Sequence, residues 1–107
     1  MSEVAAFFDQ VAGTVDADKV QGMSATYQFN VTGDNGGEWT VAIADGAVTV
    51  AAGTTDSPSI TLTIDDANFL DLVAGKLNGQ TAFLTGKLKI QGDMTLAMKL
   101  QSIFNLG

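Results

Sequence analysis

The chain has 107 residues, a formal net charge of −7 and 46% hydrophobic residues. This length predicts a single domain over residues 1–107 with one core, and the excess of carboxylates opposes binding to nucleic acid and to anionic lipid surfaces. Because the sequence holds no His, Arg or Cys, it excludes His-dependent nucleophilic triads, imidazole or thiolate metal sites, disulfides and guanidinium clamps for phosphate.

The first segment of the chain predicts an amphipathic helix over residues 2–15, with Ser2 placed to cap it. At about 100° per residue, Glu3 and Asp9 fall opposite a single apolar arc. The arc consists of Val4, Phe7, Phe8, Val11, Ala12 and Val15. Residues 16–22 then predict a polar connection with a short helical turn.

From Ala25 onward, apolar and polar residues alternate with a period of two, which predicts strands with one buried face. Five segments share this pattern, and their inward-facing residues are Ala25, Tyr27, Phe29, Val31, Trp39, Val41, Ile43, Val48, Val50, Ile60, Leu62, Ile64, Leu88 and Ile90. The pair Asp45-Gly46 predicts a tight hairpin turn between the second and third strands. The opposite faces, Gln28 included, are polar and rich in threonine, so we expect a sheet that is covered on one side only.

Two helical segments separate the fourth and fifth strands. Asp65 is placed to cap a helix that ends near Gly75, and a shorter helical turn runs from Gln80 to Leu84. Together with the first and last helices, these segments would cover the apolar face of the sheet. The sequence therefore predicts an α+β fold in two layers, in which helices cover the dry face of a five-stranded, one-sided β-sheet.

The last predicted helix, Met94–Phe104, carries more apolar residues than one packed face can use. The arc that would pack on the sheet consists of Leu96, Ala97, Leu100, Ile103 and Phe104. Met94 and Met98 extend the apolar sector to about 220°, and Gln101 and Asn105 continue their stripe with polar groups. Periodicity alone leaves three explanations open: methionine filling of the core, a cavity for an amphiphile, and an interface between copies of the chain.

The stretch NGQTAFLTGKLKIQGDMTLAMKLQSIF, residues 78–104, resembles the C-terminal signature of the sterol carrier protein 2 family. It has an Ala-Phe pair, a Gly-Lys-Leu-Lys-Ile strand, a Gly-Asp corner and a Leu-Ala-Met-Lys-Leu helix in the order of that family. The order of the preceding elements is also similar, so the resemblance spans essentially the whole chain. It implies a lipid-carrier fold with an apolar tunnel between the sheet and the helices.

The resemblance also implies ligand-binding residues along the tunnel, for fatty acids, fatty acyl-CoA, phospholipids or sterol-like amphiphiles. By motif position these residues are Phe83, Met94, Ala97, Met98 and Gln101. Apolar residues of the covering helices and the end of the C-terminal stripe complete the candidate set: Phe7, Phe8, Val11, Phe69, Val73, Leu84 and Asn105.

Two positions depart from the pattern of that family. Asn78-Gly79 stands where the family often has Asn-Pro, and the final residues FNLG lack the Ala-Lys-Leu type of peroxisomal address. The sequence also lacks an apolar run of about 20 residues and a signal sequence. These features predict a cytoplasmic protein.

The charged residues give no catalytic site. Asp65 and Asp66 could form half of a carboxylate metal site or a general-base pair, but the capping of a helix explains them better. Lys87 and Lys89 could meet a lipid head group, although alternation places them on the polar face, where edge lysines discourage strand addition. The sequence thus predicts no catalytic residues, no metal site and no cofactor.

These observations predict nonenzymatic binding, with transfer, of a lipid or other long-chain amphiphile. The expected partners are that ligand and transient contacts with a membrane or a lipid-using enzyme, and the expected state is a monomer or weak homodimer. The alternative is an accessory interaction or dimerisation module that uses the C-terminal helix. An enzyme based on Asp and Lys is less favoured because no nucleophile–base pair is visible in the sequence.

Overall fold

The computed structural model describes residues 3–15 and 17–104, without the side chains at positions 12, 14, 17, 19 and 100–104. The helices are α1 (Glu3–Thr14), α2 (Ala17–Val20), α3 (Asp66–Val73), α4 (Gly79–Leu84) and α5 (Met94–Phe104). The strands are β1 (Ser24–Thr32), β2 (Gly37–Ala44), β3 (Ala47–Ala52), β4 (Ile60–Asp65) and β5 (Leu88–Gly92). Ser2, predicted as a helix cap, lies outside the described residues. In the described parts of the chain, no helix is long and apolar enough to cross a bilayer.

The five strands form one mixed sheet in the order β3-β2-β1-β4-β5. Strand β1 is central, where it pairs antiparallel with β2 and parallel with β4. The outer pairs, β2–β3 and β4–β5, are antiparallel. Asp45 and Gly46, with φ angles of 50° and 81°, form the predicted tight turn between β2 and β3. The α+β class and the number of strands are thus confirmed, and β3 and β5 are the two edges of the sheet.

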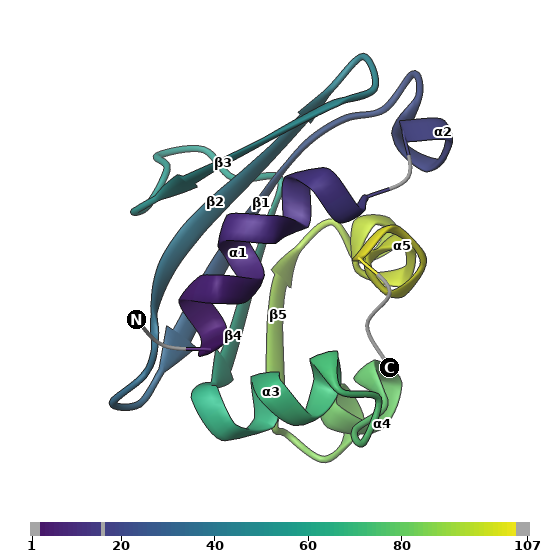
Figure 1. The fold of residues 1–107 in the computed structure, drawn as a ribbon. Helices are drawn as coiled ribbons and strands as arrows, with labels where there is room; N and C mark the ends of the chain where they lie inside the picture. Colours follow the sequence, from purple (N-terminus) through teal and green to yellow (C-terminus); the bar gives the residue numbers. More distant parts are fainter. Residues whose placement is uncertain (1–2, 16, 105–107) are drawn as a thin grey trace.

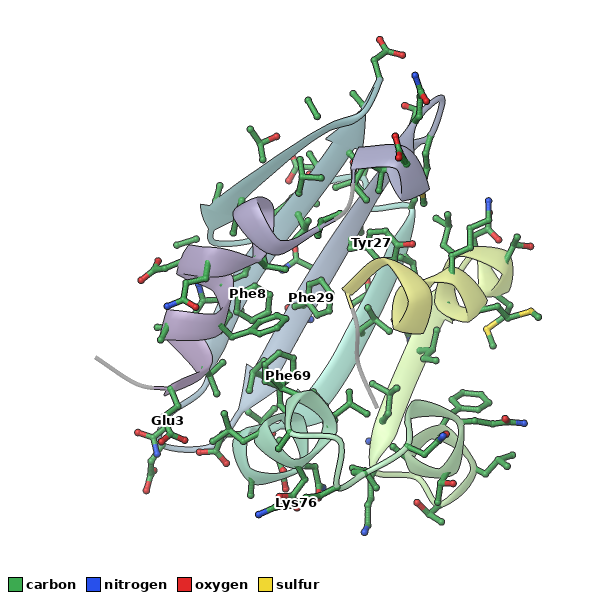
Figure 2. All side chains as sticks on the ribbon, turned by 45° about the vertical axis from the view of Figure 1, so that its right-hand side comes forward. Glu3, Phe8, Tyr27, Phe29, Phe69 and Lys76 are labelled. Carbon is green, nitrogen blue, oxygen red and sulfur yellow. The ribbon has the colours of Figure 1, made fainter. Side chains whose placement is uncertain are left out.

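Helices α1, α3, α4 and α5 lie on one face of the sheet, as Figure 1 shows. Between the layers, Phe8 of α1 stacks on Trp39 of β2 and on Phe69 of α3, with ring centroids 4.5 Å and 5.5 Å apart. Figure 2 shows Phe8, Phe29 and Phe69 gathered in this core. Aromatic contacts of this kind stabilise the fold beyond the area that they bury, so they fix α1 and α3 on the sheet.

The opposite face of the sheet is polar but not fully open to solvent. Gln28, which alternation places on the exposed face, is only 3% exposed, because the loop after β3 contacts it. Its Oε1 accepts from the Thr40 hydroxyl at 3.1 Å and from the Thr55 N–H at 2.9 Å, and its Nε2 donates to the Gly53 carbonyl at 3.4 Å. The prediction that Gln28 is exposed to solvent is therefore wrong. A side-chain amide whose oxygen and nitrogen both have partners can be buried at little cost.

The two carboxylates at the start of α3 have structural partners. Asp65 caps the helix, since its side chain accepts from the N–H of Asn68 at 2.7 Å. Asp66 accepts from the N–H of Ala67 at 2.8 Å and from that of Asn35 at 3.0 Å, which ties α3 to the β1–β2 loop. The capping interpretation is confirmed for Asp65. Among the described residues, no group of three or more His, Cys, Asp or Glu side chains is placed to hold a metal ion.

A sharp corner joins β5 to α5. Gly92 ends the strand with a φ of 116°, and Asp93 alone separates it from the helix. A Cβ atom on Gly92 would lie 2.6 Å from the carbonyl oxygen of Ser59 and 2.9 Å from the Cα of Ile60. The Asp93 N–H donates to the same Ser59 oxygen at 3.1 Å, and the Asp93 carboxylate accepts from the Thr95 N–H at 2.9 Å. The corner therefore requires glycine and sets the direction of α5.

We expect Gly92→Ala to lower the free energy of unfolding by about 2–4 kcal/mol, because alanine there combines an unfavourable positive φ with a collision against the β4 backbone. Gly13→Ala is the matched control. Gly13 lies in α1 without a positive φ, and a Cβ there meets open space, so this change should leave stability unchanged or raise it by up to about 1 kcal/mol. Urea unfolding followed by the fluorescence of Trp39, the single tryptophan, measures both. Equal effects of the two substitutions would contradict the role of the corner.

Candidate functional site

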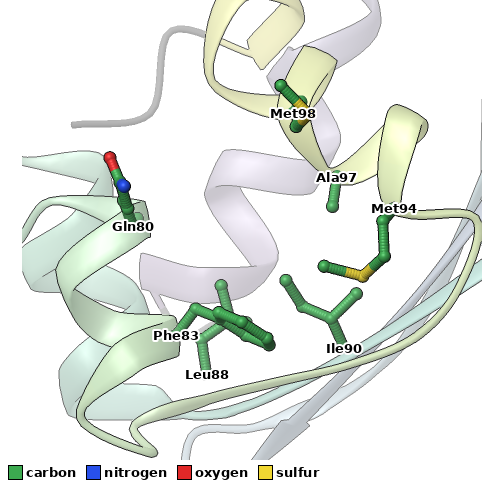
Figure 3. Close-up of a pocket in the computed structure, with 8 residues that line it drawn as sticks. Gln80, Phe83, Leu88, Ile90, Met94, Ala97 and Met98 are labelled. Carbon is green, nitrogen blue, oxygen red and sulfur yellow. The ribbon is translucent and has the colours of Figure 1, made fainter.

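A pocket of about 390 Å³ opens between α4, β5 and α5. Its lining residues are Gly79, Gln80, Phe83, Leu88, Ile90, Met94, Ala97 and Met98. Figure 3 shows the side chains of Phe83, Leu88, Ile90, Met94 and Ala97 directed toward one another, whereas that of Gln80 lies apart from them on α4. Among these described lining residues, Gln80 alone has a polar side chain. The site is thus an apolar hollow with one polar group in its lining.

Helix α5 forms one wall of the pocket. Met94, Ala97 and Met98 are spaced i, i+3 and i+4, so they lie on the same face of the helix. Leu96 is half-buried and packs against the core, as the sequence predicted for the sheet-facing arc. The helix therefore uses one face to cover the sheet and an adjacent face to line the pocket.

Strand β5 and helix α4 form the rest of the pocket. Leu88 and Ile90, two positions apart, both lie on the inward face of β5. Gln80 and Phe83 come from α4. Helix α4 packs on β5, whereas α5 packs on both β4 and β5. Asn78 starts α4 by accepting from the N–H of Gln80 at 2.8 Å. Helices α4 and α5 thus both pack on the edge strand β5, and the pocket lies between them.

Apolar side chains around this pocket are exposed to solvent. In the part of the chain that the structure describes, the exposed large hydrophobic residues are Phe83 (40%), Leu84 (74%), Met94 (47%) and Met98 (80%). Three of the four line the pocket, and Leu84 follows Phe83 on α4. Filling of the core, one of the three explanations left open by the sequence, does not fit Met98 at this exposure. A cluster of exposed apolar groups marks a surface that binds an apolar partner.

A hydrogen bond from the sheet holds α5 in place. Tyr27 on β1 is fully buried, and its hydroxyl donates to the carbonyl oxygen of Leu96 at 3.0 Å. Burial of the phenol, and secondarily the negative charge of Asp93, raise the pKa of Tyr27 from 10.0 to about 12. The folded protein therefore keeps the neutral donor form, and the link between sheet and helix persists across the physiological pH range.

The structure brings part of the predicted set of site residues together. Phe83, Met94, Ala97 and Met98 all line the pocket. Leu84 is exposed on α4 but is not a lining residue. The side chain of Gln101 and the whole of Asn105 lie outside the described part of the structure.

The other predicted site residues lie in the core. Phe8, Val11 and Phe69 are each 1% exposed, whereas Phe7 and Val73 are half-buried and pack against that core. The rings of Phe7 and Phe69 are in edge contact, with centroids 5.3 Å apart. None of the five is a lining residue of the pocket. Ligand contact by them stays a prediction, as does the tunnel implied by the family resemblance.

Four lining residues are absent from the predicted set. The alternation of β5 assigns Leu88 and Ile90 to the core, and the sequence gives Gly79 and Gln80 no role, although all four line the pocket. The sequence did contain a hint for Leu88 and Ile90, because their strand directly precedes α5, the helix with more apolar residues than it can pack. The order of strands, which makes β5 an edge, comes only from the structure.

A second hollow of about 350 Å³ lies between α1 and strands β2 and β3. Its lining includes Phe8, Trp39 and Val50 together with the polar residues Asp9 and Thr49. The indole of Trp39 is half-buried here, on the inward face as predicted, and does not line the α4–β5–α5 pocket. Tryptophan fluorescence therefore reports on folding more directly than on occupancy of that pocket.

Comparison with known sequences places the chain among its relatives. Residues 6–105 match the SCP-2 sterol transfer family. The chain belongs to this family. The resemblance drawn from residues 78–104 is therefore confirmed, and the match extends over nearly the whole chain.

Two curated relatives show how this domain occurs in longer proteins. Peroxisomal multifunctional enzyme A of Dictyostelium discoideum is 39% identical over 94 residues, which are 85% of this chain and 21% of that protein. Sterol carrier protein 2 of Homo sapiens is 39% identical over 87 residues, which are 78% of this chain and 16% of that protein. The SCP-2 domain described here thus spans about a fifth or less of the length of these relatives.

A solved structure shares the architecture of this SCP-2 domain. The solution structure of palmitated SCP2L2 from Aedes aegypti superposes with a TM-score of 0.75 at 26% identity. The match covers 97% of this chain and 95% of that one. The five-stranded sheet covered by helices is therefore an SCP-2 fold.

Substitution of Tyr27 tests its link to α5 in the SCP-2 domain. We expect Tyr27→Phe to lower the free energy of unfolding at neutral pH by about 0.5–1.5 kcal/mol, because the Leu96 carbonyl loses a donor. The chain has one tyrosine, so the ultraviolet absorbance of tyrosinate reports this group alone. The phenol should titrate near pH 12 in the folded protein and near pH 10 in the unfolded chain.

The same pKa shift predicts a dependence of stability on pH. The folded state holds the phenol proton more tightly than the unfolded state, so the stabilisation from Tyr27 is complete below pH 10 and is lost as pH rises towards about 12. Over this window, the stability of the wild type should fall relative to that of Tyr27→Phe. Parallel pH profiles for the two proteins, or titration of the folded phenol near pH 10, would contradict the buried hydrogen bond.

Proposed function

We propose that the chain binds a long-chain lipid in the α4–β5–α5 pocket and releases it again without changing it chemically. The observation that carries this proposal is the apolar hollow of about 390 Å³ with Met98, 80% exposed, in its wall. Its volume falls within the range of about 300–1,000 Å³ that is typical of small-molecule sites. Membership of the SCP-2 sterol transfer family supports a lipid as the ligand class.

Binding would draw its free energy from the burial of hydrocarbon. About ten methylenes, at about 0.8 kcal/mol each, would contribute about 8 kcal/mol before the cost of association. The thioether side chains of Met94 and Met98 are flexible and polarisable, so they can adapt to hydrocarbons of different shape. The proposed ligands are therefore fatty acids, fatty acyl-CoA, phospholipids or sterol-like amphiphiles, with loose specificity.

Gln80 is the polar counterpart of the apolar walls. Its amide can donate to and accept from the head group of an amphiphile whose hydrocarbon lies against Phe83 and Met94. The palmitated relative from Aedes aegypti supports an acyl chain as one such ligand. The amphiphile would thus be oriented by one polar contact and held by its hydrocarbon.

We also propose that residues 1–107 form a single domain, that the protein is cytoplasmic, and that it is a monomer or weak homodimer. One matched relative is named a peroxisomal enzyme, so imaging of a tagged chain tests the location separately. Size-exclusion chromatography with light scattering tests the oligomeric state.

Palmitate binding tests the proposal directly. At a free concentration about 100-fold above the Kd, palmitate should stabilise delipidated protein by about 2.7 kcal/mol and raise its Tm by roughly 10 °C. Differential scanning calorimetry measures this shift. The proposal fails if saturating palmitate leaves the Tm unchanged and an organic extract of freshly purified protein contains no lipid.

A matched pair of variants assigns the binding to this pocket. Met98→Asp and Leu84→Asp each place one carboxylate at an exposed apolar position, but only Met98 lines the pocket. Met98→Asp should weaken palmitate binding by about tenfold or more, because a charge would border the hydrocarbon, whereas Leu84→Asp should change it by less than about twofold. Isothermal titration calorimetry measures both. If Met98→Asp instead dissociates a dimer, and neither the wild type nor the variant binds palmitate, dimerisation through α5 replaces lipid binding as the proposed function.

A further inference from the structure

Strand β3 is an outer edge of the sheet, as Figure 1 shows. The Gly53 N–H donates to the Glu38 carbonyl at 2.7 Å, directly beyond the last residue of β3. Because bonded and non-bonded pairs alternate along an antiparallel ladder, the odd-numbered residues of β3 bond to β2. The backbone N–H and C=O groups of Val48, Val50 and Ala52 therefore point away from β2, and no strand of the described chain lies beyond them.

The sequence of β3 leaves this edge open to another strand. Residues 47–52 read AVTVAA, without a charged residue or a proline. Charged residues and proline are two of the usual means by which proteins keep an edge strand from pairing. The opposite edge, β5, has such protection, because Lys89 lies within that strand and is exposed. The β3 edge is therefore the better suited of the two to accept an added strand.

The hollow of about 350 Å³ between α1, β2 and β3 lies beside this edge. Val48, Val50 and Ala52, whose backbone groups face outward, all line it. In an antiparallel pair, directly opposite residues point their side chains to the same face of the sheet. A residue that added opposite Val50 would thus bond to its backbone and direct its own side chain to the face on which the hollow lies. One ligand, an extended peptide, can both pair with the edge and fill the hollow.

The charges around the hollow favour a basic side chain. Asp9, which is exposed, contributes a carboxylate to the lining. Residues 37–58, which form β2, β3 and most of the loop after β3, contain three carboxylates and no lysine. The stacked rings of Phe8 and Trp39, with centroids 4.5 Å apart, form an aromatic wall. The methylenes of a Lys or Arg side chain can pack on such a wall while its charge meets the Asp9 carboxylate.

We propose that the β3-edge site, defined by Asp9, Trp39, Val48, Val50 and Ala52, binds an extended segment of a partner protein. The segment adds antiparallel to β3 and places a Lys or Arg side chain in the hollow, next to Asp9. A second copy of the chain fits less well, because its own β3 holds no cation and each copy carries a net charge of −7. This site lies at the opposite edge of the sheet from the α4–β5–α5 pocket, so the inference goes beyond the proposed lipid binding.

A synthetic peptide tests the site. In acetyl-TVTKTVT-amide, the lysine and both valines share one face, so all three can lie inward while the threonines face outward. Trp39 lines the hollow and is the single tryptophan, so its fluorescence reports peptide binding. We expect saturable binding that weakens as salt rises, and a glutamate in place of the lysine should weaken it about tenfold or more.

N-methylation of the peptide tests strand addition. A methyl group on the lysine nitrogen removes an N–H that would bond to β3, whereas one on the neighbouring threonine nitrogen modifies a group that points away from β3. The first change should weaken binding about tenfold or more, and the second by less than about threefold. Equal losses from the two methylations, or no binding at about 1 mM peptide, would overturn the proposal.

A matched pair of protein variants tests the charge. Asp9→Asn should weaken binding of the lysine peptide about three- to fivefold and leave palmitate binding unchanged. Asp71→Asn makes the same change at an exposed position of α3, outside the hollow, and should alter peptide binding by less than about twofold. Equal effects of the two variants would contradict the role of Asp9. If light scattering shows a dimer of the chain alone that the peptide dissociates, a second copy is the occupant and the partner segment is ruled out.

Discussion

Strand β5 ends at Gly92 and helix α5 begins at Met94, so a single residue turns the chain from the sheet onto its apolar face. The turn is held from two sides, by the Asp93 N–H that donates to the Ser59 carbonyl and by the Tyr27 hydroxyl that donates to the Leu96 carbonyl. These two bonds join the first turn of α5 to β1 and to the start of β4. With the direction of α5 fixed in this way, the spacing of its apolar residues decides what they face.

Helix α4 is fixed to the other end of β5 by an equally short connection. The Lys87 N–H donates to the Ala82 carbonyl at 2.8 Å, and Gly86 makes the turn with a φ of 81°. The two helices that border the pocket are therefore each held within a few residues of the strand between them. Because neither helix can shift far without breaking backbone hydrogen bonds, the hollow between them is preorganised, which lowers the cost of filling it.

An open pocket has a different energetic balance from a closed cavity. A sealed apolar void loses contacts on every side and destabilises the fold in proportion to its volume. Here Met98 and Met94 face solvent, so the cost is that of leaving apolar area in water, about 25 cal/mol per Å². A hydrocarbon that covers this area recovers that free energy.

The sequence was sufficient to predict the local structure, and also that α5 carries more apolar residues than one packed face can use. Apolar residues that repeat every two positions located all five strands, and the helical repeat of 3.6 showed that Met94 and Met98 lie outside the packing arc. The capping chemistry of Asp65 located the start of α3. Pairing between distant strands could not be read from it. The parallel pairing of β1 with β4 makes β5 an edge, and this places Leu88 and Ile90 in the pocket.

Burial was the other property that local pattern could not supply. Phe8 and Phe69 are predicted ligand contacts, and the structure adds that both are buried, with their rings stacked between α1 and α3. Gln28 has the alternation of an exposed residue, yet a loop more than twenty positions away supplies its hydrogen-bond partners. Both outcomes depend on which distant segment covers a face, and that information is not local.

The methionines themselves offer the most direct measurement of the central claim, that the surplus apolar face of α5 holds a guest hydrocarbon. The chain has four methionines, and among the described ones Met94 and Met98 line the pocket whereas Met23 packs against the core. In NMR spectra of protein with isotope-labelled methionine methyl groups, added palmitate should shift the Met94 and Met98 signals and give Overhauser contacts between their methyl groups and the acyl chain, with Met23 unchanged. Unchanged Met94 and Met98 signals at saturating palmitate, or acyl contacts to Met23 alone, would contradict the account.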